Sequence, residues 1–244
     1  MDRMRSGLLT LALPDGHQQG PTMEFLGRTS LRVEGYGKLD TRRLSANLPG
    51  LAVKVVRPQD MPTQVAVGHF DLAITGKDWL MDHRARFPNA PVDALLKLNL
   101  EYAGSKLPYT RIVAVVTESM KVTNVEEFRR WAYGNGAECV RVASELVNLA
   151  DQYARTHHFG RYRVIPTWGA TEAFLPEDAD LIIEVTETGS TLRKNGLVII
   201  DELLRSTAHL IVNRSAMRSR EKRPIVDAMT EDFMKAGAEE AGDL

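Results

Sequence analysis

The chain has 244 residues, 43% of them hydrophobic and 26% charged, and a formal net charge of -1 at pH 7. This composition is typical of a globular protein with a buried core, and the near-zero charge excludes bulk electrostatic attraction to nucleic acid or to an anionic membrane. The single cysteine, Cys139, excludes an internal disulfide, and no apolar run reaches membrane-spanning length. With no export signal in the sequence, we expect a cytoplasmic protein.

Short apolar runs alternate with helical stretches along the chain. The runs are rich in β-branched residues and are continuous rather than alternating, which indicates strands buried on both faces of an α/β sheet. We expect strands at residues 8–13, 52–56, 72–74, 112–116, 140–143, 181–185, 197–200 and 210–212.

Two helices have recognisable starts. Apolar residues at helical spacing between 146 and 154 predict a helix that has Ser144 as its cap and stops near Gly160. A second helix would begin at Asp60, as N-cap, and end at Gly68. The cluster of basic residues between Arg214 and Arg223 is typical of a solvated helix face.

The organisation of these elements predicts two lobes. Residues 101–108, which contain Gly104 and Pro108, are the expected crossing between them. We expect a first lobe at residues 1–105, a second at 106–207, and a return of the chain to the first lobe in 208–244. The predicted architecture is therefore two α/β lobes around a cleft.

Polar residues follow two of the strands expected in the first lobe. Arg57 comes directly after residues 52–56, and Thr75-Gly76 comes directly after residues 72–74. In a parallel sheet both strands end at the same edge, where ligands of open α/β folds bind. The alternative is that these are ordinary turn residues between a strand and a helix.

The segment 184–191 carries the most specific signal. An apolar strand runs into Glu187-Thr188-Gly189-Ser190-Thr191, a turn of small residues whose N–H and hydroxyl groups suit an anion with several oxygens. Glu184, just before the turn, would accept hydrogen bonds from sugar hydroxyls. Phosphate together with hydroxyls indicates a sugar phosphate, although turns of this composition are common. The pattern is neither a P-loop nor a dinucleotide fingerprint.

Taken in order, these segments resemble the ATP phosphoribosyltransferase family, which catalyses the first step of histidine biosynthesis. The fold it implies is α/β, of the periplasmic-binding-protein type II kind. Because the chain ends one expected helix after Asn213, the resemblance is to the short form, which lacks the C-terminal histidine-binding domain. The resemblance covers residues 11–14, 57–62, 71–78, 141–144 with 148–149, 169–172, 186–192, 195–197 and 208–213.

The resemblance implies that N1 of ATP displaces diphosphate from C1 of phosphoribosyl diphosphate, with Mg2+ neutralising the leaving group. It implies a homodimer, or a hetero-oligomer with a regulatory subunit similar to histidyl-tRNA synthetase. Glu184 and Arg42 would be the catalytic residues, and Glu172 and Glu184 would face the ribose hydroxyls or the metal. The further substrate-binding residues would be Thr188, Gly189, Ser190 and Thr191 around the 5-phosphate, with Thr186, Glu187, Asp15, Gly16, His17, Arg57, Thr75, Gly76 and Ser144.

The chain departs from the family pattern at three residues. Asp15 and His17 stand where the family usually has lysine and arginine, and Glu184 stands where it has aspartate. In addition, Glu101-Tyr102-Ala103 with a short insertion replaces a Gly-Phe-Gly-like stretch before the second lobe. A carboxylate repels a polyphosphate unless a cation lies between them. A second interpretation is therefore a catalytically impaired paralogue that acts as a phosphoribosyl- or nucleotide-binding or regulatory protein. A third, a solute receptor of the periplasmic-binding type, requires an export signal.

Overall fold

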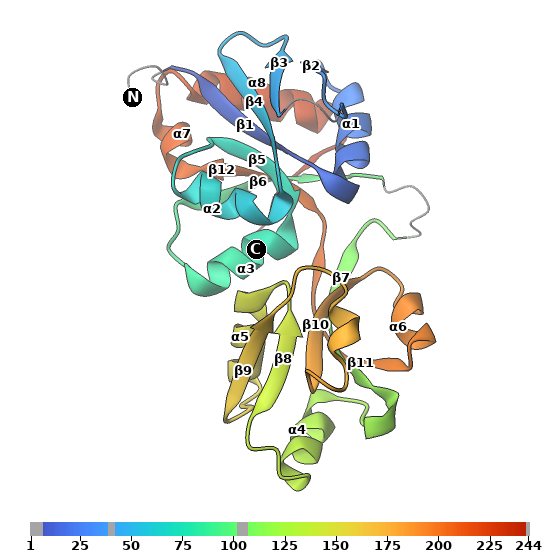
Figure 1. Ribbon diagram of the computed structural model, residues 1–244. Helices are drawn as coiled ribbons and strands as arrows, with labels where there is room; N and C mark the ends of the chain where they lie inside the picture. Colours follow the sequence, from blue (N-terminus) through green and yellow to red (C-terminus); the bar gives the residue numbers. More distant parts are fainter. Residues whose placement is uncertain (1–6, 39–41, 102–106, 243–244) are drawn as a thin grey trace. The chain divides into compact units, whose positions relative to one another are not determined.

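The computed structural model describes residues 7–38, 42–101 and 107–242. The chain divides into two compact units (Figure 1). Unit 1 takes Met1–Leu80, Phe87–Pro108 and Thr207–Leu244, and unit 2 takes Met81–Arg86 and Tyr109–Ser206. Residues 102–106 of the expected crossing lie outside the described ranges. Within those ranges, no helix is both long and apolar enough to span a membrane.

The core of unit 1 is a parallel strand trio. Strand β1 (Leu9–Pro14) pairs in parallel with β4 (Leu51–Val56) on one side and with β5 (Leu72–Gly76) on the other. These strands belong to a sheet with the order β13-β6-β12-β5-β1-β4-β3-β2. Its other members are β2 (Val33–Glu34), β3 (Arg43–Ala46), β6 (Val92–Leu98), β12 (Ala208–Asn213) and β13 (Glu239–Glu240).

Both faces of this sheet are covered, as continuous apolar strands require. Leu11 points to the face covered by α1 and α8, and Ala12 points to the face covered by α2 and α3. Phe25 and Phe233, from α1 and α8, meet edge to face at 5.3 Å. The helical elements of this unit are η1 (Gly16–Gln18), α1 (Gln19–Gly27), η2 (Pro58–Asp60), α2 (Met61–Ala66), α3 (Lys77–Arg86), whose end lies in unit 2, α7 (Arg214–Arg218) and α8 (Arg223–Lys235).

Unit 2 is built on a mixed sheet with the order β11-β7-β10-β8-β9. Strand β10 (Leu181–Thr186) runs parallel to β8 (Val140–Ser144) and antiparallel to β7 (Thr110–Thr117). Ile182 of β10 packs in one cluster with Leu175 and Leu192, from the segments on either side of β10. The remaining elements are η3 (Glu118–Met120), α4 (Val125–Gly134), α5 (Val147–Thr156), β9 (Tyr162–Pro166), η4 (Thr171–Phe174), α6 (Ser190–Lys194) and β11 (Leu197–Ser206).

All eight expected strands and the helix at 146–154 are confirmed, with ends shifted by a few residues. Asp60 is the N-cap residue of α2, as expected, but its side chain makes no capping hydrogen bond. The helical path already begins at Pro58, after Arg57 in an extended conformation. Ser144 ends β8, and its hydroxyl accepts from the N–H of Leu146 at 2.9 Å, whereas Leu146 itself occupies the cap position of α5.

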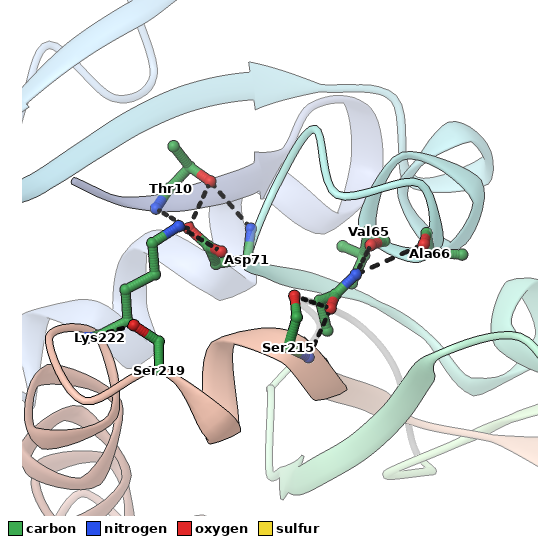
Figure 2. A network of polar contacts seen from close by, with 8 residues as sticks. Thr10, Val65, Ala66, Asp71, Ser215, Ser219 and Lys222 are labelled. Atoms are coloured by element: carbon green, nitrogen blue, oxygen red, sulfur yellow. Dashed lines mark hydrogen bonds and ion pairs between the residues drawn. The ribbon is translucent and has the colours of Figure 1, made fainter. Parts of the chain in front are cut away.

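A buried ion pair in unit 1 joins Asp71, just before β5, to Lys222, just before α8 (Figure 2). Asp71 accepts from both the N–H and the hydroxyl of Thr10 at 2.9 Å, and its two oxygens lie 2.8 Å from the ammonium of Lys222. The side chains of Asp71 and Lys222 are only 8% and 22% exposed. Lys222 therefore belongs to the interior and not to the solvated helix face that the sequence indicated.

We expect Lys222→Met to lower the free energy of unfolding by about 3 kcal/mol, because it leaves a buried carboxylate without its cation. Urea denaturation followed by circular dichroism measures the change. The matched control is Arg223→Met, which removes an exposed pair with Asp227 at 3.5 Å and should cost at most about 0.5 kcal/mol. Equal losses in the two variants would contradict the burial argument.

Candidate functional site

The first candidate cluster lies at the carboxyl edge of the parallel trio in unit 1. Asp15 follows β1 and Arg57 follows β4, so the parallel pairing brings them to one edge. Arg42 reaches the same edge because its carbonyl accepts the N–H of Val55, in β4, at 2.9 Å. Three residues that are distant in sequence thus meet through strand pairing.

Asp15 accepts a hydrogen bond from Arg42 and lies next to Arg57. Its Oδ2 is 2.7 Å from Nη1 of Arg42 and 3.6 Å from Nε of Arg57. The Asp15 side chain is 12% exposed, against 62% for Arg42 and 63% for Arg57. Its other oxygen, Oδ1, is buried and accepts no hydrogen bond from the described residues. The carboxylate therefore lies inside, and the two guanidinium groups face outward.

The remaining residues of this edge are structural or exposed. Thr75 is fully buried, and its hydroxyl donates to the carbonyl of Pro58 at 2.9 Å. A Cβ at Gly76 would collide with the side chain of Asp78. Gly16, at a φ of +68°, turns the chain after β1, and His17 beside it is exposed.

The second candidate cluster lies at the end of β10 in unit 2. Glu184 is half-buried, and its Oε1 accepts the N–H of Val185 at 2.8 Å. Burial, together with the carboxylates of Glu172 and Glu145, raises the pKa of Glu184 to about 7, against weaker lowering by hydrogen bonds from Val185 and Thr171. Two neighbouring carboxylates thus add to the effect of burial in favouring the protonated form of Glu184.

The loop after β10 is held by its own hydroxyls. The N–H of Gly189 donates to the hydroxyl of Thr186 at 3.0 Å, and the N–H of Ser190 donates to that of Thr188 at 3.4 Å. Thr188, Ser190 and Thr191 are exposed, and Glu187 is half-buried. A phosphate bound here would accept the hydrogen bonds that these two N–H groups now donate to threonine hydroxyls.

Gly189 has the conformation that this loop requires. Its φ of +69° lies in the left-handed region, and a Cβ would come within 2.9 Å of Cδ1 of Ile199 and 3.4 Å of Nη1 of Arg193. Both the backbone conformation and the neighbouring side chains therefore disfavour a side chain at this position.

Ser144 and Asp82 form hydrogen bonds that hold the segments next to this cluster in place. Ser144 is fully buried, and its hydroxyl donates to the carbonyl of Ile183 at 2.8 Å, which joins the ends of β8 and β10. Asp82 accepts the N–H groups of Asn148 and Leu149 at 2.8 and 2.9 Å and so caps α5. Burial raises the pKa of Asp82, which these hydrogen bonds partly offset. No local sequence pattern marks Asp82, because its partners lie 66 and 67 residues away.

The metal-binding capacity of these residues is limited. Among the described residues, no group of three or more His, Cys, Asp or Glu side chains is placed to hold a metal ion. Glu172 lies close enough to Glu184 to raise the pKa of Glu184, and both carboxylates supply hard oxygen donors. Such a donor set fits a Mg2+ ion that is bound by one or two carboxylates and otherwise by substrate phosphates and water.

Comparison with known proteins gives a consistent result. A family model described as ATP phosphoribosyltransferase matches residues 57–235. The ATP phosphoribosyltransferase of Prosthecochloris aestuarii is 33% identical over 227 residues, which are 91% of this chain and 69% of that protein. The ATP phosphoribosyltransferase of Thermodesulfovibrio yellowstonii is 28% identical over 225 residues, which are 90% of this chain and 69% of that protein.

Solved structures share the fold. The ATP phosphoribosyl transferase (HisG:HisZ) complex from Thermotoga maritima contains a chain that matches with a TM-score of 0.73 at 23% identity, covering 94% of this chain and 98% of that one. The alkanesulfonate-binding protein SsuA from Xanthomonas axonopodis pv. citri matches with a TM-score of 0.50 at 11% identity, covering 94% and 73%. These likenesses confirm the predicted α/β fold of the periplasmic-binding-protein type.

We expect Gly189→Ala to destabilise unit 2 by about 2 kcal/mol, because it combines left-handed strain with crowding against Ile199. The matched control is Gly196→Ala, since Gly196 has nearly the same φ, +67°, but nothing within 4 Å of its Cβ position. The control should lose only about 1 kcal/mol from the backbone strain. Thermal and urea unfolding of both variants measure the difference, and a control that loses as much as Gly189→Ala would exclude crowding.

Glu184 should make stability depend on pH. Its folded pKa of about 7 lies above its ordinary value of 4.5, so between these values the folded state binds more protons than the unfolded state. Stability therefore falls as the pH rises through this window. Relative to wild type, Glu184→Gln should gain about 2 kcal/mol between pH 5 and pH 8. Urea unfolding at both pH values measures this gain, and an equal wild-type and variant profile would contradict it.

Proposed function

The chain belongs to the ATP phosphoribosyltransferase family, and we propose that it transfers phosphoribosyl from phosphoribosyl diphosphate to N1 of ATP. The observation that carries the proposal is the family match over residues 57–235, which includes the whole second cluster and Arg57 of the first. In this reaction the N1 lone pair forms a bond to C1 of the ribose. The C1–O bond breaks, and diphosphate leaves with that electron pair. The reaction is the first step of histidine biosynthesis.

This chemistry needs no covalent enzyme intermediate. The protein contributes by aligning two anionic substrates and by stabilising the charge of the departing diphosphate. In unit 2, residues Thr186–Thr191 would hold the 5-phosphate, and Glu184 would accept hydrogen bonds from the ribose hydroxyls. Ser144 would help to fix the position of Glu184, since its hydroxyl donates a hydrogen bond to the carbonyl of Ile183, the preceding residue.

In unit 1, the outward guanidinium groups of Arg42 and Arg57 would bind phosphate oxygens. Arginine suits this role because its planar fork of N–H groups matches phosphate geometry. The exposed Gly16 would allow the ligand to approach the backbone at the same edge, and the exposed His17 would contact it, whereas Gly76 is buried beside Asp78. Thr75 contributes by fixing that edge, because its hydroxyl is bonded to Pro58.

The family uses a divalent metal, and we propose Mg2+ that enters with the phosphates of the substrate. When bound, the ion would neutralise charge on the leaving diphosphate. Glu172 and Glu184 are the side chains that would hold it, since their carboxylates lie close to one another.

We also propose that the chain forms a homodimer or assembles with a HisZ-type regulatory subunit similar to histidyl-tRNA synthetase. The support is its structural likeness to a chain of the HisG:HisZ complex from Thermotoga maritima. Size-exclusion chromatography of the chain with and without such a subunit tests both assemblies. Two unshifted peaks would exclude the hetero-oligomer, and elution of the chain alone at its monomer mass would exclude the homodimer.

We expect the purified chain, with the subunit if one assembles, to form phosphoribosyl-ATP from ATP, phosphoribosyl diphosphate and Mg2+. Glu184→Gln should lower kcat/KM for phosphoribosyl diphosphate at pH 8.5 by about tenfold or more, the effect of losing a charged hydrogen-bond acceptor. The control is Glu126→Gln, an exposed carboxylate of the same unit paired with Arg129, which should be unaffected. Mass spectrometry of the product measures the rate. A wild-type protein that yields no phosphoribosyl-ATP refutes the proposed function.

A further inference from the structure

Two arginines share one buried carboxylate at the carboxyl edge of β1 and β4. A lone exposed arginine samples many rotamers, and fixing it on binding costs conformational entropy. Here the hydrogen bond from Arg42 to Asp15 and the charge of Asp15 on Arg57 already restrict both side chains. The carboxylate therefore does part of the ordering before any ligand arrives.

Asp15 itself is held firmly. Its N–H donates to the carbonyl of Val56 at 3.3 Å, which ties it to the end of β4. The preceding residue, Pro14, is the last of β1, and its carbonyl accepts the hydroxyl of Tyr36 at 2.6 Å. Because these hydrogen bonds hold the backbone at Pro14 and Asp15, the carboxylate of Asp15 can restrict the guanidinium groups that it contacts.

We propose that Asp15 is a positioning residue that orients Arg42 and Arg57 for a polyphosphate, either the triphosphate of ATP or the diphosphate of phosphoribosyl diphosphate. The identity of the ligand rests on the proposed function. Each guanidinium group has five N–H donors, and Asp15 engages only a few of the ten. The others are left for phosphate oxygens.

The charges and the burial agree with this role. Two guanidinium groups against one carboxylate leave the cluster positive. The Asp15 side chain is 12% exposed and the arginines more than 60%, so an anion arriving from solvent meets the arginines first. The carboxylate that replaces the family's lysine therefore acts behind the cations and not in place of one.

The opposing hypothesis is that Asp15 simply repels the polyphosphate. The two hypotheses predict opposite signs, because removal of a repelling charge tightens binding, whereas removal of an anchor weakens it. Asn at position 15 has nearly the same volume as Asp and keeps an oxygen that can accept from Arg42, but it carries no charge. It should therefore rescue part of the loss seen with Ala.

The test is calorimetric titration of the full chain with ATP, with phosphoribosyl diphosphate and with inorganic diphosphate, each with Mg2+. We expect Asp15→Ala to weaken one or more of them about tenfold, and Asp15→Asn about threefold. The nucleotide or sugar phosphate that weakens identifies the source of the polyphosphate. Unchanged or tighter binding in Asp15→Asn would overturn the proposal, and this variant decides the question if Asp15→Ala folds poorly.

Two further measurements separate positioning from other effects. In an Arg42→Gln background, Asp15→Ala should cost less than tenfold, because one of the two groups that it positions, the one that donates a hydrogen bond to it, is gone. An undiminished loss would overturn the proposal. Asp93→Asn is the matched control, since it removes the carboxylate that Arg214 contacts at 2.7 and 2.9 Å in the same unit, and it should leave binding unchanged. If the variants rank as expected but wild type forms no phosphoribosyl-ATP, the proposed function fails and the role of Asp15 stands.

Discussion

The structure depends on the parallel pairing of β1 with its two neighbours, β4 and β5. Because β1 and β5 are almost entirely buried, their side chains are mostly apolar and the polar chemistry of this edge follows the strand ends. Parallel direction then places the polar residues that follow β1 and β4 at one edge, together with the end of β5. The cluster of Asp15, Arg42 and Arg57 is a consequence of strand direction, and so is its position at the edge where open α/β folds bind ligands.

The same constraint operates in unit 2, where β10 runs parallel to β8. The buried hydroxyl of Ser144 joins the ends of the two strands through the carbonyl of Ile183, the residue before Glu184. A carboxylate at that position is partly removed from water and lies among other carboxylates, which is why its pKa rises. The following loop must turn sharply, and the left-handed Gly189 allows it to do so.

Much of this could be predicted from the sequence, because buried strands produce continuous apolar runs and the loop after β10 has a distinctive composition. The strands β2, β3, β6, β9 and β13 were not predicted. An edge strand such as β9, which contains Arg163 and ends at Pro166, shows no such run. Contacts between distant residues were also beyond reach. Asp82 at the start of α5 and Lys222 against Asp71 depend on tertiary packing, and nothing in their local sequence distinguishes them from surface charges. The roles of the candidate site residues remain proposals.

The two clusters have opposite electrostatic character. In unit 1 a single carboxylate lies beneath two guanidinium groups, so the surface offered to a ligand is cationic. In unit 2 the carboxylates of Glu145, Glu172 and Glu184 raise the proton affinity of one of them, so that cluster favours a positive partner. A polyphosphate therefore needs no added cation at the first cluster, whereas at the second a divalent ion would both relieve the repulsion among carboxylates and bridge them to phosphate. The reversal of charge at Asp15 is thus compatible with transfer chemistry, because the arginines beside it already supply the positive charge that a lysine there would have provided.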